Sequence, residues 1–242
     1  MGWGQRVFGL GLIALGLVNL ALGQAVAGGL AAPKAAAAAF LILAGAALQW
    51  RRTAPWVALA VVAYELIWVL GVNNGPVILA HPGEYLNYYG AAEPGALAAA
   101  ALVIFARGGR VPAGRAEGLI RAGRVVFGLS AIYFGGSHFL AMGMTAPLVP
   151  EWLPPSQVFW GYATGVFHIL GGLALVSGVQ ARLAAILLTV MYASFTPLVH
   201  VPMFLADQHS HRNWVENAMN VALTGVAWVM ADALSRRKIA GA

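Results

Sequence analysis

Three polar side chains, Tyr192, Thr196 and His200, stand at helical spacing inside a long apolar stretch of the sequence. Residues four apart stack along one face of an α-helix, so these three would form a polar stripe. Polar side chains are costly in hydrocarbon and normally face protein or a wet cavity. Imidazole can shuttle protons near neutral pH, ligate a metal or hydrogen-bond a carbonyl. We therefore predict that the function lies on this face.

Polar residues of other apolar segments are expected to join the stripe. A quinone site needs a His or Tyr donor beside an apolar slot, which Phe134, Phe159, Trp160 and Phe195 could wall. In the competing structural interpretation, the polar groups only satisfy backbone carbonyls such as the one freed by Pro197. The predicted pocket, for a quinone or another small molecule, consists of His138, His168, Tyr192, Thr196, His200, Glu216 and Asn220.

A metal site is the sharper alternative for the same region. His209 and His211 lie in the last predicted outer loop, where they could meet His138 and His200. Imidazole combined with thioether sulfur suits copper, but no zinc-type ligand spacing is present. The structural alternative is that His209 and His211 belong to a hydrated loop that binds no metal.

Glu65 is the costliest polar residue of the first half, because it falls within an apolar segment. A charged carboxylate facing lipid is strongly disfavoured, so we expect it to be protonated or paired across an interface. A role in a proton relay is the functional hypothesis, and a structural hydrogen bond is the alternative.

The composition is that of a membrane protein. Of the 242 residues, 60% are hydrophobic and only 9% are charged, with a mean hydropathy of +0.77. A soluble domain carries about 25% charged residues. Because Ala, Gly and Leu dominate, the apolar segments are predicted to be helices rather than barrel strands. The sequence has no Cys, which excludes disulfides and thiolate metal sites from its own side chains.

The fold class predicted is an all-α membrane protein with about eight transmembrane helices. With the N-terminus inside, 12 of the 14 Lys and Arg residues fall on the inner side and only Lys34 and Arg212 fall outside. The positive-inside rule then places both termini in the cytoplasm and explains the net charge of +6 without a nucleic-acid partner. Segments long enough for a core of about 30 Å fall at 7–27, 34–50, 54–72, 91–107, 122–141, 157–177, 181–201 and 214–234.

The sequence also contains a weak internal repeat. Phe8-Gly9-Leu10 matches Phe127-Gly128-Leu129 at an offset of 119, and Phe40 to Gly45 matches Phe167 to Gly172 at an offset of 127. Four spans return each half to the same side, so the repeats would be parallel.

We predict a first repeat at 1–108, a basic cytoplasmic linker at 109–121 and a second repeat at 122–242. The alignment pairs Asn19 with His138, Leu41 with His168, Glu65 with Tyr192, Asn73 with His200, and Glu93 with Asn220.

Four short motifs of the second half carry a resemblance to a known family: Gly135-Gly136-Ser137-His138-Phe139, Pro150-Glu151-Trp152-Leu153-Pro154, Gly171-Gly172 and Arg182-Leu183-Ala184-Ala185. Residues 122–234 thereby resemble the DoxX/DoxD-like family of small four-span membrane proteins, and the first half looks like a degenerate copy. One departure is His168, where the family commonly has a glutamate before the glycine pair. The resemblance implies a redox-associated membrane subunit, linked to quinone-coupled sulfur-compound oxidation or to oxidative-stress assemblies with soluble oxidoreductases.

The leading hypothesis is therefore a quinone-linked or redox-associated subunit in the lipid bilayer of a bacterial inner membrane, with a soluble oxidoreductase or another redox subunit as its partner. No cofactor motif or nucleophile constellation indicates independent turnover. The alternatives are a non-enzymatic small-molecule carrier and a scaffold for a periplasmic protein.

Overall fold

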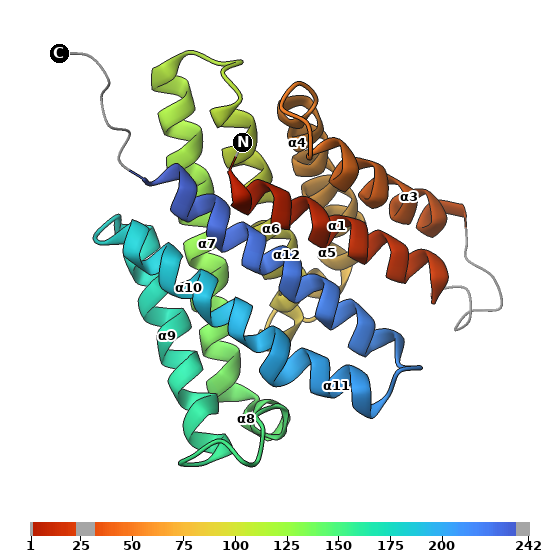
Figure 1. Ribbon diagram of the computed structural model, residues 1–242, viewed down its shortest axis with the longest axis vertical. Coiled ribbons are helices and arrows are strands. Elements are labelled where there is room, and N and C mark those ends of the chain that lie inside the picture. Colours follow the sequence, from red (N-terminus) through yellow and green to blue (C-terminus); the bar gives the residue numbers. More distant parts are fainter. Residues whose placement is uncertain (1, 23–31, 236–242) are drawn as a thin grey trace.

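The computed structural model describes residues 2–22 and 32–235, and this part of the chain consists of helices joined by short loops, with no β-strand (Figure 1). The all-α prediction is confirmed. Six of the helices are regular along their length: α1 (Trp3–Ala21), α3 (Ala32–Ala47), α6 (Tyr89–Arg107), α7 (Ala113–Leu140), α9 (Gln157–Ser177) and α12 (His211–Ala233).

Two further helical stretches are composite, because a π-helical segment interrupts each of them. The first runs through α4 (Ala54–Ala63), η1 (Tyr64–Asn74) and α5 (Gly75–Ala80). The second runs through α10 (Ala181–Phe195), η4 (Thr196–His200) and α11 (Val201–Ala206). Short elements complete the described chain: η2 (Tyr85–Tyr88), α8 (Met142–Thr145) and η3 (Ala146–Leu148).

Among the described residues, five helical stretches are long and apolar enough to cross a membrane: Trp3–Ala21, Ala54–Ala80, Tyr85–Arg107, Gln157–Ser177 and Ala181–Ala206. A sixth exists if α7 and the short helix after it, which bend by 92°, form one span. Many large apolar side chains also point outward, including Leu79 and Leu187. A helix that is apolar on its outer side suits a lipid environment. The chain is therefore compatible with a multi-pass membrane protein.

Several helix ends differ from the sequence-based expectation. α7 begins at Ala113, so most of the predicted linker 109–121 is helical. The two composite helices continue to Ala80 and Ala206, past the predicted ends at residues 72 and 201. α6 begins at Tyr89 and keeps Pro94 inside the helix, although proline cannot donate the usual bond. The predicted first span extends to residue 27, and its last residues lie outside the described part.

Two helix pairs approach each other closely through glycine. α1 packs along α3, and α7 packs along α9. A Cβ atom at Gly45 would collide with the carbonyl oxygen of Gly9, and one at Gly172 would lie 2.5 Å from the carbonyl oxygen of Gly128. Small residues are common where membrane helices pack backbone to backbone. The same device therefore joins the first two long helices of each half.

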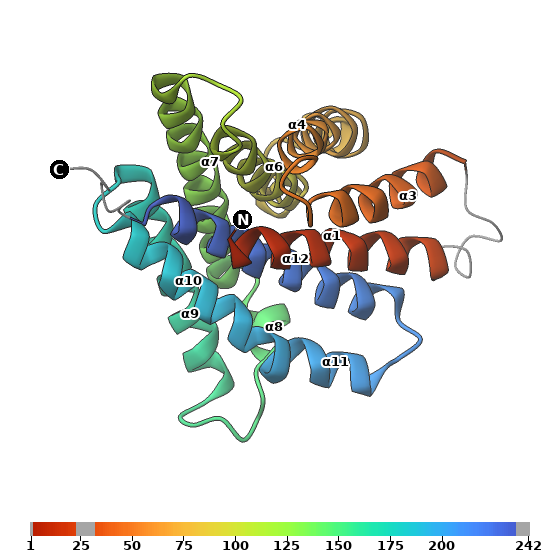
Figure 2. The same ribbon diagram turned by 45° about the horizontal axis from the view of Figure 1, so that its top comes forward.

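The halves are joined by their outer helices. α1 lies along α12, as Figure 2 shows, and α7 packs against α6. The Gly4 N–H donates to Oδ2 of Asp232 at 3.3 Å, so α1 begins where α12 ends. Phe8 of α1 and Phe127 of α7 are both fully buried in the shared core. The two ends of the described chain thus lie at the same end of the bundle.

Candidate functional site

The Tyr192–His200 stripe spans the change from α-helix to π-helix. α10 ends at Phe195, and Thr196–His200 forms a π-helix with wider turns. The prediction that Tyr192, Thr196 and His200 share one face of a continuous α-helix is therefore wrong beyond Phe195. Pro197 lies in this segment and supplies no N–H, which favours a break in the regular bonding. π-helical turns inside longer helices often occur at functional sites.

Two amides of α12 hold this irregular segment. The Asn220 side chain donates to the carbonyl oxygen of Tyr192 at 3.0 Å and to Oγ1 of Thr196 at 2.9 Å. The Asn217 side chain donates to the carbonyl oxygen of His200 at 2.7 Å. These bonds satisfy backbone carbonyls that an unbroken α-helix would satisfy itself. Asn220 therefore positions Tyr192 and Thr196, as a supporting residue of the predicted pocket would.

His138 of α7 and His168 of α9 face each other, with ring centroids 5.3 Å apart. Nδ1 of His168 lies 2.8 Å from the carbonyl oxygen of Thr164, and Nδ1 of His138 lies 3.0 Å from that of Gly161. A carbonyl can only accept, so both Nδ1 atoms carry the proton and donate. In the neutral rings this leaves both Nε2 atoms as acceptors.

Tyr192 extends this pair into an aromatic cluster. Its ring centroid lies 5.4 Å from that of His168 and 6.1 Å from that of Phe195. Phe134 contacts His168 from α7 at 6.3 Å. Tyr192 is only 2% exposed, and its hydroxyl is buried with no hydrogen-bond partner among the described residues. The structure thus brings together His138, His168 and Tyr192, and we call these three the His–Tyr cluster.

Asn220 and Thr196 connect to the His–Tyr cluster through the Tyr192 backbone, whereas His200 and Glu216 lie apart from it. Nδ1 of His200 is buried without a partner, and no ring contact links His200 to the cluster in the described chain. Glu216 faces Arg212, with 3.8 Å between Oε1 and Nε, at the start of α12.

The described residues contain no cluster of ligands that matches the alternative prediction of a metal site. Within residues 2–22 and 32–235, no three His, Asp or Glu side chains come close enough to hold a metal ion. His138, His200, His209 and His211 therefore do not converge as that alternative expected.

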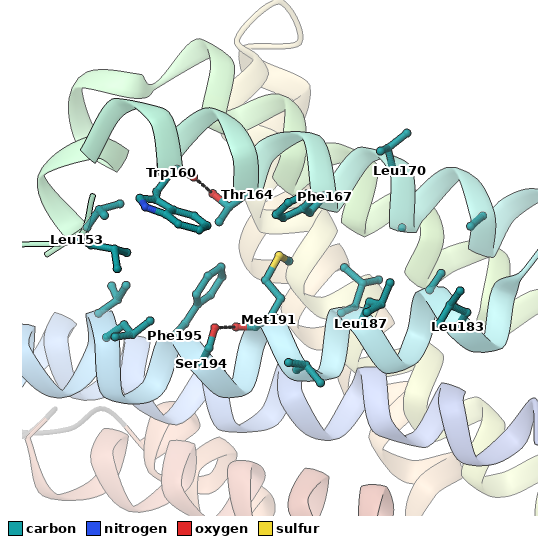
Figure 3. Close-up of a pocket in the computed structure, with 18 of the residues that line it drawn as sticks. Leu153, Trp160, Thr164, Phe167, Leu170, Leu183, Leu187, Met191, Ser194 and Phe195 are labelled. Carbon is teal, nitrogen blue, oxygen red and sulfur yellow. Dashed lines mark hydrogen bonds between the residues drawn. The ribbon is translucent and has the colours of Figure 1, made fainter. Parts of the chain in front are cut away.

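A groove of about 650 Å³ runs between α9 and α10 and is closed at one end by the loop before α9 (Figure 3). Trp160, Thr164 and Phe167 enter it from α9, and Leu187, Met191 and Phe195 enter it from α10. Its surface is almost wholly apolar. Small-molecule sites have volumes of roughly 300–1,000 Å³, so the groove is large enough for a ligand.

None of the seven predicted pocket residues lines this groove, but two wall residues connect it to the His–Tyr cluster. The Thr164 hydroxyl donates to the carbonyl oxygen of Trp160 at 2.7 Å and lies 3.1 Å from Nδ1 of His138. The ring of Phe195 contacts both His168 and Tyr192. The His–Tyr cluster thus lies directly behind the groove wall. Of the predicted aromatic walls, Trp160 and Phe195 line the groove.

Sequence reasoning missed a group of carboxylates between the halves. Glu65 on η1 is only 2% exposed, and η1 packs against α6, which carries Glu93. α6 also packs against α12, which carries Glu216. Glu93 was noted only as the counterpart of Asn220. Its place eight residues after the start of the membrane-length stretch Tyr85–Arg107 is the signal that could have identified it.

Comparison with known proteins adds one match. A family model described as a domain of unknown function, DUF8561, matches residues 127–233, from within α7 to the end of α12. The chain is therefore similar to that family over the part that holds the His–Tyr cluster and the groove. No curated protein and no solved structure matches the chain.

Proposed function

We propose that this protein is a quinone-binding subunit of a redox-associated assembly in a bacterial inner membrane, and that the groove between α9 and α10 is its ligand site. The observation that carries the proposal is the placement of an apolar groove of about 650 Å³ directly against the His–Tyr cluster. An isoprenoid tail needs an apolar slot open to the bilayer. The ring needs hydrogen-bonding groups at one end.

The residues present fit such a ligand. Leu183, Leu187 and Leu170 would contact the tail, and the aromatic end near Trp160 and Phe195 would contact the ring. Thr164 supplies a hydroxyl in the wall, and behind the wall lies the buried hydroxyl of Tyr192, which has no hydrogen-bond partner among the described residues. A bound quinone would supply the redox chemistry, and this chain would hold the ring and exclude water.

The proposed topology has eight membrane-crossing helices in two parallel four-helix repeats, with both termini in the cytoplasm. The close glycine contacts Gly9–Gly45 and Gly128–Gly172 support the duplication, because they occupy matched positions. The π-helical segments η1 and η4 also fall at matched positions in the repeat alignment. In this arrangement a soluble oxidoreductase or another redox subunit is the partner.

The test is to block the groove without changing the cluster. Leu187→Trp places an indole in the groove, whereas Ile186→Trp adds the same bulk on α10 at a position outside the groove lining. We expect Leu187→Trp to weaken decylubiquinone binding about tenfold or more, and Ile186→Trp to leave the dissociation constant unchanged. Tryptophan fluorescence or isothermal titration in detergent measures both.

Equal affinity in the two variants would remove the groove from the proposal. Binding of phospholipid acyl chains that decylubiquinone does not displace would instead favour a lipid or small-molecule carrier. Retention of a soluble partner by both variants, without any quinone binding, would favour the scaffold alternative.

A further inference from the structure

A second cavity lies among the ends of helices, whereas the groove lies between the faces of two helices. Its volume is about 240 Å³, and it lies where α1 and α4 begin and α6 and α12 end. The polar side chains that line it are those of Gln5, Arg51, Arg107 and Asp232, from four separate parts of the chain. No part of the proposed quinone site reaches it.

The walls of this cavity are fixed by close packing. A Cβ atom at Gly4 would lie 2.5 Å from the backbone nitrogen of Val229, and one at Gly108 would collide with Pro55. The Gln5 side chain donates to the carbonyl oxygen of Leu48 at 2.7 Å, which ties α1 to the turn before α4. The helix ends around the cavity are therefore closely packed against one another.

The charges that line the cavity suit a phosphodiester. Two guanidinium groups and one carboxylate give a net charge of +1. Arginine presents N–H donors in a fork that matches phosphate oxygens. The carboxylate of Asp232 can accept from hydroxyl groups, beside the bond it already accepts from the Gly4 N–H. A monoanionic phosphate that carries hydroxyl donors would satisfy both signs of charge.

The surroundings place this cavity at the level of lipid headgroups. Trp3, Trp50 and Trp56 are 67%, 62% and 58% exposed at this end of the bundle. Tryptophan side chains concentrate at the boundary between hydrocarbon and headgroups. Arg6 lies over the Trp3 ring at 5.5 Å and Arg110 over the Trp56 ring at 5.6 Å, so further cations surround the same level. Basic side chains at this level attract anionic lipids.

We propose that this cavity binds the headgroup of an anionic glycerophospholipid, with its phosphodiester against Arg51 and Arg107 and its headgroup hydroxyls toward Asp232. Free phosphate would make the same contact with the two arginines as the lipid phosphodiester. The hydroxyl-accepting carboxylate and the adjoining Trp side chains favour the lipid.

The experiment is native mass spectrometry of the full chain in a neutral detergent, with phosphatidylglycerol and phosphatidylcholine as probes. We expect one phosphatidylglycerol molecule to bind with about tenfold preference over phosphatidylcholine. Arg51→Gln should lower that affinity about tenfold, while Arg52→Gln, the loss of the same charge one residue away and outside the cavity lining, should leave it unchanged.

Equal loss in Arg51→Gln and Arg52→Gln would show attraction to surface charge and would overturn the site. Equal binding of the two lipids would overturn the headgroup assignment. Displacement of phosphatidylglycerol by millimolar inorganic phosphate would identify free phosphate as the ligand and contradict the lipid proposal. If Arg51→Gln does not fold, Arg51→Lys keeps the charge but loses the fork, and undiminished affinity in that variant would count against the Arg–phosphate contact.

Discussion

In the proposed duplication, α3 and the stretch from α4 into η1 correspond to α9 and α10, yet their facing surfaces differ. The ring of Phe40 on α3 packs against that of Tyr64, the first residue of η1, with centroids 4.9 Å apart. At the aligned positions, Phe167 and Met191 instead line the groove of about 650 Å³. Replacing an aromatic partner with a flexible methionine leaves an adaptable wall. The aligned positions thus hold a ring contact in the first half and part of a groove wall in the second.

The buried polar groups differ in the same sense. Leu41 and Glu65 of the first half are both buried, where the aligned residues of the second half are His168 and Tyr192. The second half therefore gathers hydrogen-bonding rings next to a groove, whereas the first half holds a buried carboxylate on η1, which packs against α6. The part of the chain that matches DUF8561 is the second half.

The largest effect is expected at the close glycine contacts, which occur in both halves. Gly172→Leu would force a side chain against the Gly128 backbone, so we expect a loss of about 3 kcal/mol in the free energy of unfolding. Gly45→Leu should cost a similar amount, because its contact with Gly9 is equally close. Titration with SDS in mixed micelles measures both.

Gly118→Leu is the control, because a Cβ atom there meets nothing within 4 Å and the residue lies in α7. This variant should be neutral or stabilised by up to about 1 kcal/mol. A small effect at Gly45 together with a large one at Gly172 would break the parallel between the halves.

A smaller effect is expected from removing a side chain that holds the π-helical segment η4. Asn220→Ala removes the bonds to the Tyr192 carbonyl and the Thr196 hydroxyl, and leaves a buried carbonyl unsatisfied. We expect a loss of about 2 kcal/mol in the free energy of unfolding. Glu93→Ala at the aligned position removes no side-chain hydrogen bond that the structure shows, and should cost less. The reverse order in the same SDS titration would show that the first half depends more on its polar residue.

The smallest expected effect sharpens the comparison of the two helix pairs. Tyr64→Met copies the residue found at the aligned position of α10. The loss of the ring contact with Phe40 should lower the free energy of unfolding by about 1 kcal/mol. Phe40→Leu, which removes the other ring of the pair, should cost a similar amount, and full stability in both variants would show that the ring contact contributes nothing.

The sequence was sufficient for the helical class because composition and long apolar segments determine it. It also predicted that His138, His168 and Tyr192 would meet, since each is a polar residue on an otherwise apolar helix. It could not predict the groove, because a groove depends on how far apart α9 and α10 pack. It could not locate the π-helical turns either, and those turns set the position of His200 relative to Tyr192. The carboxylates Glu65 and Glu93 are far apart in sequence, and only the packing of η1 on α6 brings their helical segments together.

The most direct test of the account is photolabelling with an azido-quinone, followed by peptide mapping of the full chain in native-like lipid. The account predicts label on α9 and α10, within residues 160–174 and 183–199, and competition by unlabelled quinone. It also predicts that Leu187→Trp abolishes this label and Ile186→Trp does not. Competable label on α3 and α4 instead, or label that unlabelled quinone does not reduce, would contradict the assignment of the groove.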